Sequence, residues 1–140
     1  MELEKKITDK DSRIGIIGLG YVGLPLAILF QESGFDVTGI DIDESKIKDL
    51  KEDKSYIAHI GIDTIKKLNN SGFIASTDFS LVKDLDVLIV CVPTPLNVNR
   101  EPDLSYINAT FDTIENYIHK NQIISVESTT YPGMTDELIA

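Results

Sequence analysis

Three glycines interrupt an aliphatic run near the start of the chain: Gly18, Gly20 and Gly23 lie within the segment IGIIGLGYVGLPLA, residues 14–27. Glycine loses more backbone entropy on folding than any other residue and has no side chain to pack, so its repeated use here needs a conformational reason. The spacing G-x-G-x-x-G between a strand pattern and a helix pattern is typical of a loop that turns tightly and approaches a diphosphate. This feature predicts a β-α-β unit at the start of the fold.

Short β-branched runs alternate with helical patterns along the rest of the chain. The patterns predict strands over 13–17, 36–40, 73–76, 86–92 and 123–128, and helices over 22–33, 44–51, 62–69 and from Asp103, as N-cap, to about His119. The run DVLIVCV at 86–92 is apolar on both faces, which is typical of a parallel sheet covered on both sides. The alternation therefore predicts an α/β fold, a Rossmann-type doubly wound parallel sheet of five strands in the order 3-2-1-4-5.

The sequence also supports predictions for the two ends of the chain. Residues 1–12 are expected to form a solvated leader, helical in part, before a dinucleotide-binding domain over 13–140. After a turn at Pro132 and Gly133, the last residues, TDELIA, start a helix pattern that the sequence does not finish. We therefore expect a fragment whose sixth strand is truncated, and we expect the apolar surface left there to favour self-association.

Composition narrows the class of protein. With 23 acidic and 13 basic residues the net charge is −10, which disfavours nucleic acid or an anionic membrane as a partner. Apolar runs all fall short of the roughly 20 residues that a membrane span needs. One cysteine, Cys91, excludes an internal disulfide and a cysteine-rich metal site and favours a cytoplasmic location. His59 and His119 are expected at the surface, so no metal is predicted.

An acidic residue, Asp41, follows the second predicted strand, 18 residues after Gly23. A carboxylate there can accept hydrogen bonds from both adenosine ribose hydroxyls and repels a 2'-phosphate. Because the next residue is Ile42 and not an arginine, NAD is favoured over NADP. Three alternatives stay open: an ordinary turn in which Asp41 caps the next helix, an S-adenosylmethionine enzyme, and an NAD-sensing module without catalysis.

Two loops follow the ends of later predicted strands, where ligands bind in open α/β sheets. The first, VCVPTP at 90–95, offers the Thr94 hydroxyl near the expected nicotinamide-side ribose. The second, ESTTYPG at 127–133, brings the hydroxyls of Ser128, Thr129 and Thr130 beside the expected nicotinamide. By themselves, both loops are equally consistent with rigid turns that carry capping hydroxyls.

Five motifs in the same order resemble the N-terminal NAD-binding domain of the UDP-glucose/GDP-mannose dehydrogenase family: GLGYVGLPLA, GIDIDESKI, VCVPTPL, PDLSYI and ESTTYPGMTDEL. The resemblance runs from about Arg13 to the last residue. Within the family it is greatest to bacterial UDP-N-acetylglucosamine 6-dehydrogenases. It implies oxidation of a UDP-sugar at C6 to the uronic acid, reduction of two NAD molecules, a role in polysaccharide precursor biosynthesis and a homo-oligomeric full-length protein.

The resemblance also implies the site residues. It assigns cofactor contacts to Gly18, Leu19, Gly20, Tyr21, Val22, Gly23, Asp41, Lys46, Val92, Pro93, Thr94, Pro95, Ser128 and Thr129. Thr129 would also position a water molecule, with Thr130 as its neighbouring competitor. The nucleophilic cysteine of the family would lie beyond residue 140, because Cys91 is expected to be a buried strand residue. We therefore expect the chain to bind NAD weakly and to oxidise no sugar. The hydroxyls at 128–130 argue against the alternative of an NAD-sensing module without catalysis.

Overall fold

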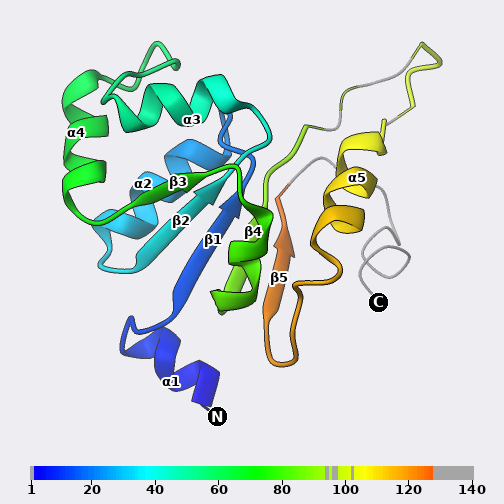
Figure 1. Ribbon diagram of the computed structural model, residues 1–140, viewed down its shortest axis with the longest axis horizontal. Helices are drawn as coiled ribbons and strands as arrows, with labels where there is room; N and C mark the ends of the chain where they lie inside the picture. The colour runs from blue at the N-terminus through cyan, green and yellow to red at the C-terminus, as the bar shows by residue number, and fades with distance from the viewer. Residues whose placement is uncertain (1, 94, 96–97, 102, 128–140) are drawn as a thin grey trace.

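A five-stranded parallel sheet organises the computed structural model, which describes residues 2–93, 95, 98–101 and 103–127 (Figure 1). Its strands are β1 (Arg13–Ile17), β2 (Asp36–Ile40), β3 (Ile74–Ser76), β4 (Val87–Val90) and β5 (Ile123–Val126). Neighbouring strands pair in the order β3-β2-β1-β4-β5, and every pair is parallel. The predicted fold class and strand order are therefore confirmed.

The connections between strands are mostly helical. The helices are α1 (Glu2–Thr8), α2 (Gly23–Glu32), α3 (Glu44–Lys51), α4 (Ile62–Asn70) and α5 (Ser105–Ile114), with a 3-10 helix, η1 (Phe79–Asp84), between β3 and β4. Helix α1 lies within the segment predicted as a leader, and η1 was not predicted. None of the helices in the described part of the chain is long and apolar enough to span a membrane.

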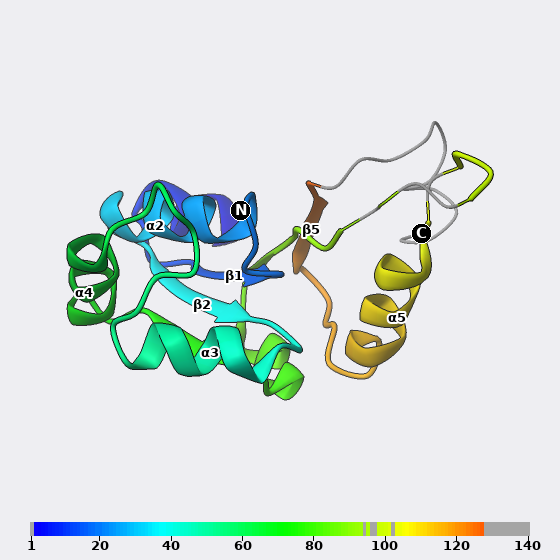
Figure 2. The same ribbon diagram turned by 90° about the horizontal axis from the view of Figure 1, so that it is seen from above.

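Both faces of the central strands β1, β2 and β4 are largely buried, and each face has its own core. On β1, Ile14 and Ile16 pack with residues of α2, α3 and α4, whereas Ile17 packs with β4, η1 and α5. Figure 2 shows α2, α3 and α4 gathered on one side of the molecule and α5 on the other side of β5. Full burial of an aliphatic side chain contributes about 1.5–3 kcal/mol, so neither face of these strands can carry polar residues without cost. This explains the continuous apolar runs.

The central position of β1 fixes where the glycine segment lies. Ile17, its last residue, pairs with Ile40 of β2 on one side and with Val90 of β4 on the other. The chain order of the strands reverses between β1 and β4, and open α/β sheets bind their ligands beyond such a point. The glycine loop therefore leaves the sheet at the place where a ligand is expected.

One predicted helix is shorter than its pattern suggested. Helix α5 ends at Ile114, whereas the periodicity predicted a helix to about His119. The reason is tertiary: the His119 ring and the Gln122 side-chain amide both contact the Leu85 carbonyl oxygen, at 2.8 and 2.9 Å. These bonds turn the chain toward β5. At the other end of α5, the Asp103 carboxylate accepts the Ser105 N–H at 2.9 Å, but the N-cap residue is Leu104, one position later than predicted.

Candidate dinucleotide site

The protein's own backbone geometry and packing require two of the three glycines in the loop. Gly18 has φ +94°, in the region that favours glycine, and a Cβ there would lie 2.6 Å from the Cys91 carbonyl oxygen. A Cβ on Gly23 would lie 1.7 Å from the Gly18 carbonyl oxygen. A Cβ on Gly20, by contrast, would have no atom within 4 Å. Gly20 therefore faces open space, and the protein's own packing does not require a glycine there.

Backbone donors of this loop are available to a ligand. The Leu19 N–H is used internally, because it donates to the Asp41 carboxylate at 2.8 Å. In the described part of the chain, the N–H groups of Gly20, Tyr21 and Val22 have no hydrogen-bond acceptor, and no side chain caps α2. Unpaired N–H groups and the dipole at a helix N-terminus together favour an anion. The loop is thus suited to a diphosphate even though the chain is acidic.

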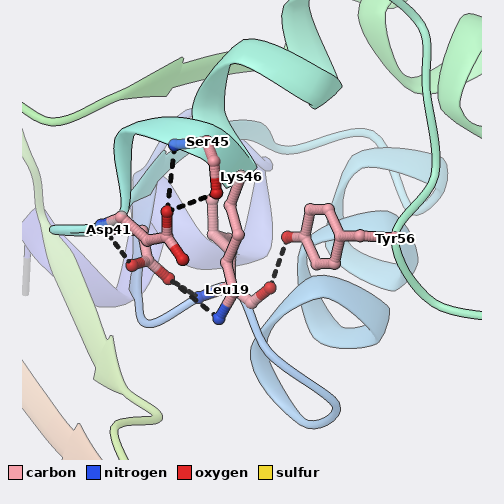
Figure 3. A network of polar contacts seen from close by, with 6 residues as sticks. Leu19, Asp41, Ser45, Lys46 and Tyr56 are labelled. Carbon is pink, nitrogen blue, oxygen red and sulfur yellow. Dashed lines mark hydrogen bonds and ion pairs between the residues drawn. The ribbon is translucent and has the colours of Figure 1, made fainter.

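Asp41 directly follows β2, and its side chain is 9% exposed. Its Oδ2 accepts the Leu19 N–H, and its Oδ1 accepts the Asp43 N–H at 2.9 Å. The Nζ of Lys46, on α3, lies 4.0 Å from Asp41 Oδ2. Figure 3 draws this ion pair. Helix α3 is capped by Asp43, which accepts the Ser45 N–H, so the alternative in which Asp41 caps the helix is wrong.

A cleft of about 600 Å³ joins these groups. Its lining includes Gly18, Gly20, Tyr21, Val22, Asp41, Lys46, Val92 and Pro93, all predicted from the sequence. It also includes residues that the sequence did not indicate, Phe79 of η1 and Tyr106, Ala109, Thr110 and Thr113 of α5. The four α5 residues fall on one helical face, but the buried apolar face of α5 is centred on Ile107 and Ile114, so the hydrophobic periodicity does not point to them.

The remaining predicted site residues are placed differently. Leu19 has a fully buried side chain in the core, and Gly23 lies in the first turn of α2. Pro95 is exposed and is not part of the cleft lining. Thr94, Ser128, Thr129 and Thr130 lie outside the described residues, as do the turn at 132–133 and the helix predicted after it.

Cys91, expected as a buried strand residue, instead directly follows β4, is half-buried and lines the cleft. Burial raises its pKa to about 11, and the negative charge of Glu127 adds to this effect. A thiol with such a pKa is protonated at neutral pH, and the thiolate is the nucleophilic form. No cluster of three or more histidine, cysteine, aspartate or glutamate side chains that could hold a metal occurs in the part of the chain described by the structure.

The doubly wound sheet, the glycine loop, the buried acid at the end of β2 and the cleft between them define a dinucleotide-binding domain of the Rossmann type. The signature of the UDP-glucose/GDP-mannose dehydrogenase family, NAD binding domain, matches residues 12–140. The chain belongs to this family, and the cofactor of the domain is NAD.

Relatives of known name agree with this family. The chain is 37% identical over 131 residues to a UDP-N-acetyl-D-mannosamine dehydrogenase of Methanocaldococcus jannaschii, covering 90% of this chain and 30% of the relative. It is 35% identical over 131 residues to a UDP-N-acetyl-D-glucosamine 6-dehydrogenase of Salmonella typhi, covering 89% and 29%. A crystal structure of a GDP-mannose dehydrogenase ternary complex from Pseudomonas aeruginosa superposes with a TM-score of 0.84 at 32% identity, covering 91% and 30%. The chain thus spans less than a third of the length of these relatives.

Proposed function

We propose that this chain binds NAD for a UDP-sugar 6-dehydrogenase, an enzyme that oxidises a UDP-hexose at C6 to the uronic acid for polysaccharide precursor biosynthesis. The candidate sugars are UDP-N-acetylglucosamine, favoured by the sequence motifs, and UDP-N-acetylmannosamine, the sugar in the name of the Methanocaldococcus relative. The observation that carries the proposal is the buried carboxylate of Asp41 beside the open position at Gly20, in one cleft.

The described residues fit this cofactor. The unpaired N–H groups of Gly20, Tyr21 and Val22 would hold the diphosphate, and a side chain at position 20 would fill the space that the cofactor needs. Asp41 would accept the adenosine ribose hydroxyls, with the ammonium group of Lys46 beside it. Cleft volumes of 300–1,000 Å³ are usual for small-molecule sites, and this one has about 600 Å³.

Other predicted contacts belong to the same proposal. Val92 and Pro93 would line the nicotinamide side of the cleft, and Thr94, Pro95, Ser128 and Thr129 would extend it. When bound, NAD accepts the hydride from the sugar. Thr129 would position a water molecule, as the family resemblance implies.

We expect residues 1–140 to bind NAD without oxidising a sugar, because their one thiol, Cys91, is protonated at neutral pH. The nucleophilic cysteine, the UDP-sugar contacts and the homo-oligomer interface would belong to other parts of the enzyme. We place the binding domain at 13–140, after a leader at 1–12, and the cytoplasmic location stays a prediction.

Calorimetry of the chain tests the cofactor proposal. NAD should bind at one site per chain, NADP should bind more weakly because Asp41 repels its 2'-phosphate, and S-adenosylmethionine should not bind. Equal affinity for NAD and NADP would contradict the role of Asp41. NADH formation by residues 1–140 with a UDP-sugar would contradict the expectation that the thiol lies elsewhere.

The reading frame beyond residue 140 tests the enzyme proposal. A glycine-flanked cysteine encoded there is expected, and the protein that contains it should reduce NAD with one of the two UDP-N-acetylhexosamines. A longer protein with no such cysteine would favour the NAD-sensing alternative.

A further inference from the structure

Tyr56, in the connection between α3 and α4, contacts the glycine loop from outside the cleft. Its hydroxyl donates a hydrogen bond to the Leu19 carbonyl oxygen, 37 positions earlier in the chain (Figure 3). The residue is half-buried and is not part of the cleft lining. Burial, with a smaller effect from Asp41, raises the pKa of the phenol, so the hydroxyl remains a donor throughout the physiological pH range.

The contact fixes one residue of the loop from both sides. The Leu19 N–H donates to Asp41, its carbonyl oxygen accepts from Tyr56, and its side chain is fully buried. The peptide that follows joins the Leu19 carbonyl to the Gly20 N–H. A trans peptide is planar, with its C=O and N–H pointing in opposite directions, and no cis peptide occurs among the described residues. Holding the carbonyl therefore also holds the direction of the Gly20 N–H.

We propose that Tyr56 is a positioning residue of the dinucleotide site: by holding the Leu19 carbonyl, it keeps the Gly20 N–H directed at the cofactor diphosphate. Gly20 lines the cleft and Tyr56 does not. On this proposal the Gly20 N–H, opposite the carbonyl that Tyr56 holds, is directed to the cleft side of the loop. The proposal rests on the proposed binding of the NAD diphosphate by the loop.

An anchor is needed because glycine makes this peptide easy to turn. Gly20 has no Cβ and packs against nothing within 4 Å at that position, so rotation of the preceding peptide meets little steric resistance. A turned peptide would present the Leu19 carbonyl oxygen to the diphosphate in place of the N–H. The partial negative charge of the carbonyl oxygen would then face the negatively charged diphosphate, which weakens binding.

The ring of Tyr56 has a second contact that links it to the adenosine end of the site. The Lys46 Nζ lies 5.8 Å from the ring centroid, within the range of a cation–π contact, and 4.0 Å from Asp41 Oδ2. The hydroxyl and the ring can therefore be tested separately. Tyr56→Phe removes the hydrogen bond and keeps the ring under Lys46.

The first test is calorimetry of the Tyr56→Phe variant of residues 1–140, compared with the unchanged chain. The Kd for NAD and for ADP should rise about three- to tenfold, the usual effect of one lost hydrogen bond, and the Kd for adenosine should not change because adenosine has no diphosphate. The matched control is Tyr117→Phe, a half-buried tyrosine in the other core, which should leave all three affinities unchanged.

The amide resonance of Gly20 in the ligand-free chain is the second test, by proton–nitrogen correlation spectroscopy. Tyr56→Phe should shift this resonance, and Tyr117→Phe should not. The proposal requires both the diphosphate-dependent loss of affinity and the Gly20 shift, so the absence of either overturns it. A wild-type chain that binds no NAD would contradict the proposed function, and the Gly20 resonance would then decide the loop orientation on its own.

Discussion

Alanine substitutions at Gly23 and Gly20 should separate what the fold requires from what the ligand requires. At Gly23 the added Cβ would lie 1.7 Å from the Gly18 carbonyl oxygen, half the ordinary contact distance of 3.4 Å. The obstructing atom is backbone and cannot rotate away, so β1 and α2 must move apart. Overpacking of this kind costs typically 1–3 kcal/mol, and we expect about 3 kcal/mol here because the overlap is with main chain.

At Gly20 the added Cβ meets nothing within 4 Å. We expect the free energy of unfolding to change by less than about 0.5 kcal/mol, as for most substitutions that disturb no packing. The methyl group would, however, occupy the space beside the loop N–H groups in which we place the diphosphate. The affinity for NAD should therefore fall at least about tenfold, equal to about 1.4 kcal/mol.

Urea and thermal denaturation followed by circular dichroism measure the first effect, and calorimetry with NAD measures the second. Gly23→Ala should lower the Tm by roughly 10 °C, whereas Gly20→Ala should leave it nearly unchanged. A Gly23→Ala variant as stable as the wild type would refute the packing argument. Wild-type NAD affinity in a normally folded Gly20→Ala variant would refute the location of the diphosphate.

Three further substitutions or treatments test other parts of the structure. Asp41→Asn leaves one acceptor oxygen for the two N–H groups of Leu19 and Asp43. Calorimetry should show that NAD binds at least about tenfold more weakly and that the preference for NAD over NADP is smaller. Cys91, with a pKa of about 11, is ~0.1% thiolate at pH 8. Its alkylation by iodoacetamide should therefore be far slower than that of a free cysteine, and the rate should increase up to about pH 11. Rapid labelling at pH 8 in the folded chain would contradict its burial. Gln122→Ala removes the donor to the Val82 and Leu85 carbonyls, each at 2.9 Å. The free energy of unfolding, measured by urea denaturation, should fall by about 1–3 kcal/mol. An unchanged urea midpoint would show that water replaces both bonds.

Much of this protein follows from local patterns in its sequence. The apolar run at 86–92 predicted a strand covered on both faces, and β4 has Leu88 in one core and Ile89 in the other. The glycine spacing predicted the turn between β1 and α2, because a residue with a Cβ cannot adopt the φ of Gly18 without strain or fit at Gly23. Such features are readable because they depend on residues within a few positions of one another.

Contacts between distant segments decided the rest. No periodicity indicates that Tyr56 reaches Leu19, that α5 forms a wall of the cleft, or that His119 and Gln122 end the helix early by binding Leu85. The hydrogen bonds among these contacts join residues 34 or more positions apart. The sequence by itself determined the order of strands and the chemistry of the glycine loop and Asp41, since both arise from backbone geometry and short-range patterns. Only the packing of the helices on the finished sheet decided which side chains surround that loop, because their relative positions depend on the whole core.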